Sequence, residues 1–220
     1  MRTSLLPYLT LFGILIYPVI YSLAVADYPG GSDNFPANAE GYSFFHNYLC
    51  DAMEPFSQNG SFNPARSMAI ISHFILGLTM IMFFYLLPEL FHFTNRKLQM
   101  TRMFGMQSMF IFLFMFTPLH DLIVILTALF GTIALIPFFY ELFKSEYHFL
   151  KTFAMICFGM SLLVFIGYTT KYGEFYLPLL QKITFVIDAT WVVWVCVLVI
   201  GKQKSMTSQN TDNQLAFSRK

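Results

Sequence analysis

Charged residues are scarce in this chain. Of its 220 residues only 11% are charged and 56% are hydrophobic, whereas about 25% of the residues of a soluble domain are charged. A water-soluble fold of this length could not bury so much apolar side chain. The chain also lacks a basic run with interleaved aromatic residues, so nucleic acid is not an expected partner.

Cysteine and the common catalytic motifs are scarce as well. The three cysteines, Cys50, Cys157 and Cys196, lie far apart and form no CxxC pair, which excludes a metal knuckle or a dithiol redox site. The sequence has no nucleotide-binding loop, no serine nucleophile elbow and no His-x-x-x-His pair. No cofactor is therefore predicted from motifs.

Long apolar runs are abundant. The stretch 100–143 is almost wholly apolar and is broken once, at residues 117–121. As one helix it would be roughly 60 Å long, about twice the hydrocarbon thickness of a bilayer, so it must cross, turn and cross back. In all, six segments are apolar enough to span a membrane. They are residues 4–26, 67–91, 102–116, 118–143, 149–170 and 177–200.

The distribution of basic residues predicts the orientation of these spans. With the N-terminus inside, ten of the thirteen Lys and Arg residues are cytoplasmic, which is the bias that the positive-inside rule expects. Arg66, Lys171 and Lys182 are then outside. The cytoplasmic ones are Arg2, Arg96, Lys97, Arg102, Lys144, Lys151, Lys202, Lys204, Arg219 and Lys220.

The predicted fold class is therefore an all-α bundle of six transmembrane helices with both termini cytoplasmic. We expect one domain over residues 1–204, with a long ordered outer loop at 27–66, and a disordered polar tail at 205–220. One alternative is that the first apolar run, which ends in Ala24-Val25-Ala26, is a cleaved signal peptide. That run is about 22 residues, longer than the usual 7–15, so an uncleaved helix is favoured.

Four ionisable residues stand out within or beside the spans. Helix rise places His73 about 10 Å and Asp188 about 16 Å below the outer surface, where ionisable groups are costly and face the bundle interior or a wet cavity. His120 and Asp121 occupy the turn between the third and fourth spans. Together they predict a polar pocket that opens outward. Three of the four also have a structural interpretation: His73 as a helix-to-helix hydrogen bond, Asp188 paired with Lys182 or a Thr hydroxyl, and Asp121 in the first turn of a helix. None of these explains His120.

The first loop contributes the remaining pocket candidates, Asp51, Arg66 and His46. Its Tyr and Phe residues are too many for a flexible linker, so we expect it to fold over the bundle or to lie at the membrane interface. Asn63-Pro64 is typical of the start of a helix, with Asn63 as the cap and Pro64 at the first position.

Four segments carry a resemblance to a known family. They are Tyr28-Pro29-Gly30-Gly31, Asn47-Tyr48-Leu49-Cys50-Asp51, Asn63-Pro64-Ala65-Arg66 and His120-Asp121. In these segments the chain resembles a family of bacterial six-span membrane proteins that is distantly similar to the DRAM/Sfk-type membrane proteins. The resemblance implies a six-helix bundle in the cytoplasmic membrane. It implies no settled activity, so no catalytic residues are carried over.

Three hypotheses of function follow. The first is a membrane protein whose outer pocket binds a lipid, a small molecule or a partner. The second is a metal-dependent hydrolase acting on lipid, with zinc held by His73, His120 and Asp188; the missing His-x-x-x-His pair counts against it, and no metal is expected. The third is a proton-coupled transporter that uses Asp188 and His73. In each case the bilayer is the principal partner.

Overall fold

The computed structural model describes residues 5–37, 41–91 and 95–218. Within these ranges the chain is helical and contains no β-strand; an isolated bridge pairs Phe56 with Phe62. The predicted start of the first span at residue 4, the basic residues at 2, 219 and 220, and part of the link at 92–101 lie outside the described residues.

In the part of the chain that the structure describes, six long helices and three short 3-10 turns make up the fold. The long helices are α1 (Leu6–Val25), α2 (Arg66–Leu86), α3 (Arg96–Phe112), α4 (His120–Lys144), α5 (His148–Thr170) and α6 (Leu177–Ser218). The 3-10 turns are η1 (Asp51–Met53), η2 (Leu87–Leu90) and η3 (Glu174–Tyr176).

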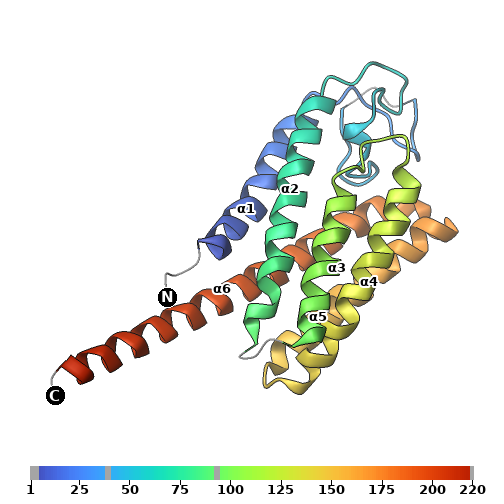
Figure 1. The fold of residues 1–220 in the computed structure, drawn as a ribbon. Coiled ribbons are helices and arrows are strands. Elements are labelled where there is room, and N and C mark those ends of the chain that lie inside the picture. Colours follow the sequence, from blue (N-terminus) through green and yellow to red (C-terminus); the bar gives the residue numbers. More distant parts are fainter. Residues whose placement is uncertain (1–4, 38–40, 92–94, 219–220) are drawn as a thin grey trace.

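Within the described residues, five helical segments are long and apolar enough to cross a membrane. They are Leu6–Val25, Arg66–Leu90, His120–Lys144, His148–Thr170 and Glu174–Met206. The chain is thus an integral, multi-pass membrane protein in contact with the lipid bilayer. The third predicted span, 102–116, corresponds to α3, which has 17 residues and is about 25 Å long. It packs between α2 and α4 and runs antiparallel to both of these longer helices (Figure 1).

Two helix starts differ from the sequence-based expectation. The third helix begins at Arg96, not 102, because the side chain of Asn95 caps it: Asn95 Oδ1 accepts a hydrogen bond from Leu98 N at 2.9 Å. The second begins at Arg66, and Asn63 caps the preceding turn instead, accepting from Ala65 N at 3.1 Å. These differences arise because hydropathy marks the lipid-embedded part of a helix and not its first turn.

The C-terminal segment also differs. Residues 205–220 are expected to be disordered, whereas α6 continues as a helix as far as Ser218. Extending an existing helix costs far less than starting one, so polar residues can continue a helix that the apolar segment has already nucleated.

Two clusters of buried residues hold the bundle together. The first joins Phe83 of α2, Phe138 of α4 and Trp191 of α6, whose rings meet edge to face at 5.5 and 5.7 Å. The second joins α1, α2 and the 27–65 loop around Tyr17 and Tyr21. In Figure 1 the loop lies at one end of the bundle, and both chain ends lie toward the other.

Candidate functional site

A cavity of about 390 Å³ lies between the helices beneath the 27–65 loop. Side chains from all six long helices line it, and loop residues 48–50 and 53 close one end. Most of the lining is apolar, including Tyr17, Tyr21, Phe112, Phe165 and Phe185. The polar side chains of the lining include those of Ser72, His73, His120, Thr127, Ser161, Tyr168, Gln181, Thr184 and Asp188.

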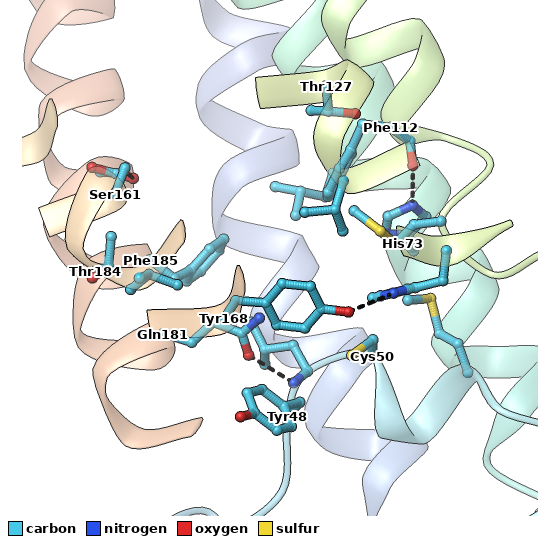
Figure 2. A pocket seen from close by; sticks show the side chains of 18 of the residues that line it. Tyr48, Cys50, His73, Phe112, Thr127, Ser161, Tyr168, Gln181, Thr184 and Phe185 are labelled. Atoms are coloured by element: carbon cyan, nitrogen blue, oxygen red, sulfur yellow. Dashed lines mark hydrogen bonds between the residues drawn. The ribbon is translucent and has the colours of Figure 1, made fainter. Parts of the chain in front are cut away.

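His73 lies on the wall formed by α2 and α3. Its Nε2 donates a hydrogen bond to the carbonyl oxygen of Phe112 at 2.8 Å, and the two rings lie 4.4 Å apart (Figure 2). Phe112 is the last residue of α3, and its carbonyl oxygen also accepts from Met115 N at 3.0 Å in the turn that follows. His73 therefore has the structural role that the sequence also allowed, while the Nδ1 of its neutral ring is left as an acceptor.

Asp188 lies on the opposite wall, on α6. Its Oδ2 accepts a hydrogen bond from Ser161 Oγ of α5 at 3.0 Å. The suggested partner Lys182 instead donates to the carbonyl oxygens of Asn47 and Pro178. Figure 2 shows Ser161 and Thr184 on one side of the cavity and Thr127 and His73 on the other.

His120 belongs to a small network that joins α4 to α5. Tyr168 Oη of α5 donates to Asp121 Oδ1 at 2.5 Å, and His120 Nδ1 lies 3.2 Å from both groups. Asp121 is in the first turn of α4, as predicted, and 83% of its side chain is exposed. His120 and Tyr168 face the cavity, whereas Asp121 faces away from it and holds Tyr168 in place.

Asn47 organises the loop above the cavity. It is fully buried; its Nδ2 donates to Gly31 O at 2.7 Å and to Asp51 Oδ2 at 2.8 Å, and its Oδ1 accepts from Ser43 N. Asp51 Oδ2 also accepts from Tyr48 N at 2.9 Å. Burial raises the pKa of the Asp51 carboxyl to about 6, and the hydrogen bond from Asn47 opposes that rise.

The loop is attached to the helices beneath it by polar contacts. Gln181 Oε1 of α6 accepts from Leu49 N at 2.9 Å (Figure 2), and Tyr21 Oη of α1 donates to Leu49 O at 3.0 Å. Lys182, which is 5% exposed, donates to the carbonyl oxygen of Asn47. These contacts fix the segment that closes the cavity.

The structure brings together three of the seven residues that the sequence singled out. His73, His120 and Asp188 line one cavity. Asp51 lies in the loop's hydrogen-bond network, and Arg66 Nε donates to Met53 O at 3.0 Å. The ring of His46 packs against Phe35 and Phe175, with ring centroids at 4.8 and 5.3 Å. Asp121 holds Tyr168, so these four residues support the site from outside.

The residues of the zinc hypothesis do not form a ligand set. Within 5–37, 41–91 and 95–218, no three His, Cys, Asp or Glu side chains come close enough together to hold a metal ion. Zinc in a catalytic site needs three protein ligands around one point. The positions of His73, His120 and Asp188 therefore weigh against that hypothesis.

Three polar atoms of the lining are unsatisfied. Among the residues that the structure describes, Thr127 Oγ1, Thr184 Oγ1 and Asp188 Oδ1 are buried without a hydrogen-bond partner, and we call them the unpaired oxygens. Thr184 is 6% exposed. Unsatisfied buried polar atoms are uncommon and costly, and three around one cavity call for a ligand or for water.

Sequence reasoning missed Tyr168, Thr127 and Ser161. Tyr168 and Ser161 lie on α5. Between Lys151 and Tyr168 this helix carries no ionisable residue other than Cys157, so its sequence gives no signal of a polar site. The spacing of Tyr168 and Ser161, seven residues or two helical turns, does place both on one face of the helix.

Comparisons with protein-family models, with curated proteins and with solved structures found no match to this chain.

Proposed function

We propose that this protein is a six-span protein of the cytoplasmic membrane, with both ends in the cytoplasm, whose cavity binds a lipid or another small molecule with an apolar body. The supporting observation is the cavity with its unpaired oxygens. Ligand sites are typically apolar clefts of about 300–1,000 Å³ with a few convergent polar groups, and this cavity has both features.

We infer that the cavity opens toward the side of the bundle between α4 and α5. Both helices line it, yet they contact each other at few positions. Ser161 of α5 belongs to the lining and is also solvent-accessible at the surface of the bundle. In a bilayer that surface faces lipid, so an apolar ligand can enter from the membrane. The resemblance to DRAM/Sfk-type proteins is compatible with this proposal and adds no ligand to it.

The test is to fill the cavity. The protein is reconstituted into phosphatidylcholine nanodiscs, and the binding of isotope-labelled dodecan-1-ol above that of empty nanodiscs is measured by mass spectrometry. Ala128→Phe places a ring in the cavity and should reduce protein-dependent binding by about tenfold. Leu129→Phe, at the exposed neighbouring position of the same helix, should leave it unchanged.

Two results would count against the proposal. Binding of dodecan-1-ol that is equal in nanodiscs with and without protein would contradict it directly. So would unchanged binding in Ala128→Phe and in Val164→Phe, which fills the cavity from the α5 wall. Proton flux that is lost in Asp188→Asn would favour the transporter hypothesis instead.

A further inference from the structure

The polar groups of the cavity include two acceptors, on Asp188 and His73, and threonine hydroxyls that can both accept and donate. Asp188 Oδ1 is an acceptor when ionised, and the Nδ1 of a neutral His73 is an acceptor because its Nε2–H is used on Phe112. Thr184 Oγ1 lies one turn before Asp188 and so on the same face of α6. The lining within the described residues includes no Lys or Arg side chain.

The cationic side chain of α6 that is nearest to Asp188 in sequence, Lys182, forms its hydrogen bonds with other groups. Lys182 Nζ donates to the carbonyl oxygens of Asn47 and Pro178 and lies among the loop residues. Asp188 therefore has the Ser161 hydroxyl on Oδ2, the thiol of Cys157 beside it, and no cation among the described residues. A buried carboxylate without a counter-ion is costly, and a positively charged ligand would relieve that cost.

Aromatic rings surround the same region. Phe185 is three residues before Asp188, so both lie on one face of α6, and its ring centroid is 5.0 Å from that of Tyr17. Both line the cavity. Aromatic faces attract cations, most strongly where water is excluded. A carboxylic acid would instead place a second carboxylate beside Asp188.

From this arrangement we propose that the cavity selects a lipophilic amine, with its ammonium group between Asp188 Oδ1 and Thr184 Oγ1 and its alkyl chain among the aromatic side chains. This inference rests on the proposed function and names the class of its ligand. Ser161 is a positioning residue: its hydroxyl holds Oδ2 of Asp188 so that Oδ1 is directed to the ligand.

The experiment compares three probes of equal chain length: dodecan-1-amine, dodecan-1-ol and dodecanoic acid. Each is bound at pH 7 to the full chain in phosphatidylcholine nanodiscs, with empty nanodiscs subtracted. We expect the amine to bind about tenfold more tightly than the alcohol, since a hydrogen bond to a charged group is worth that factor or more. The acid should bind least.

Variants identify the residue responsible. Asp188→Asn keeps the shape of the side chain and should abolish the preference for the amine while leaving dodecan-1-ol bound. Glu146→Gln, an equivalent substitution in the α4–α5 turn, should keep the preference. If Asp188→Asn does not fold, Thr184→Val gives a second measurement, in which the preference for the amine should fall severalfold.

The outcomes separate the two proposals. Equal binding of amine and alcohol in the wild type, or a preference that survives both Asp188→Asn and Thr184→Val, would overturn the amine inference alone. If no probe of any head group binds above empty nanodiscs, the proposed function fails and the inference fails with it.

Discussion

Asp51 is a buried carboxyl that accepts hydrogen bonds from Asn47 and Tyr48 of its own loop. Burial raises its pKa to about 6, above the value near 3.9 of an unfolded chain. The folded protein therefore keeps a proton that the unfolded chain has lost. This contribution to stability is fully present below about pH 4 and is lost as the pH rises through about 6.

We expect Asp51→Asn to remove that pH dependence. The amide oxygen of Asn can still accept from Asn47 and Tyr48, so the loop keeps its shape. The free energy of unfolding of the wild type should fall by up to about 2 kcal/mol between pH 4 and pH 7, and that of the variant should change by less. Thermal unfolding at several pH values measures this. Glu54→Gln, at an exposed position of the same loop, is the control, and parallel curves for wild type and Asp51→Asn would refute the prediction.

Tyr168 of α5 contacts the first turn of α4. Its hydroxyl donates to Asp121, and Tyr168→Phe removes that bond but keeps the ring beside His120. We expect a loss of about 1 kcal/mol in stability and severalfold faster release of dodecan-1-ol, measured by unfolding in detergent and by probe exchange. Tyr172→Phe, at a position that is 87% exposed, should have neither effect; the same behaviour in both variants would argue against the role of Tyr168.

Helix packing depends on small residues at defined places. A Cβ on Gly105 of α3 would lie 2.0–2.7 Å from three ring atoms of Phe84 of α2, which is itself buried. At Gly159 of α5, by contrast, nothing in the described part of the chain lies within 4 Å of that position. The two glycines are therefore a matched pair for testing close approach of helices.

Gly105→Ala should destabilise the protein by about 1–3 kcal/mol, because the ring of Phe84 has to move. Gly159→Ala should stabilise it by roughly 0.5–1 kcal/mol, since alanine is the better helix former and meets no neighbour. Unfolding of both variants in mixed micelles measures the difference. A stabilised Gly105→Ala would show that α2 and α3 do not approach as closely as described.

The helices themselves were predictable from the sequence, and their ends were less so. The fifth predicted span ends at residue 170, as α5 does, because the apolar run and the helix stop together there. The third helix begins six residues earlier than predicted, because Asn95 caps a first turn that carries Arg96 and Lys97. Depth along a helix also pointed to His73 and Asp188, but their positions in one cavity depend on how helices pack, which periodicity does not determine.

The contacts that build the site lay beyond sequence reasoning. Asp121 and Tyr168 are 47 residues apart, and Leu49 and Gln181 are 132 apart. A single sequence provides no pairing signal over such distances. The assignment of Lys182 as a possible partner of Asp188 failed for a related reason: six residues apart on a helix, the two side chains point in different directions, and Lys182 points to the loop.

Across the molecule as a whole, the proposed topology predicts which residues reagents can reach. In a variant whose three cysteines are replaced by alanine, Ser61→Cys in the loop should react with a membrane-impermeant maleimide in intact cells. Ser205→Cys on α6 should react only after permeabilisation. Both positions are exposed. Labelling of both from the same side would rule out six spans with a cytoplasmic C-terminus.

The proposed opening between α4 and α5 has a consequence for how binding is measured. These helices are joined at one end by the turn at Ser145 and at the other by the Tyr168–Asp121 bond, and the cavity lies between. A ligand that passes through this opening arrives from the bilayer, so occupancy follows its mole fraction in the lipid and not its concentration in water. Diluting the membrane with more phospholipid at constant total ligand should therefore empty the cavity, even when the aqueous volume is unchanged.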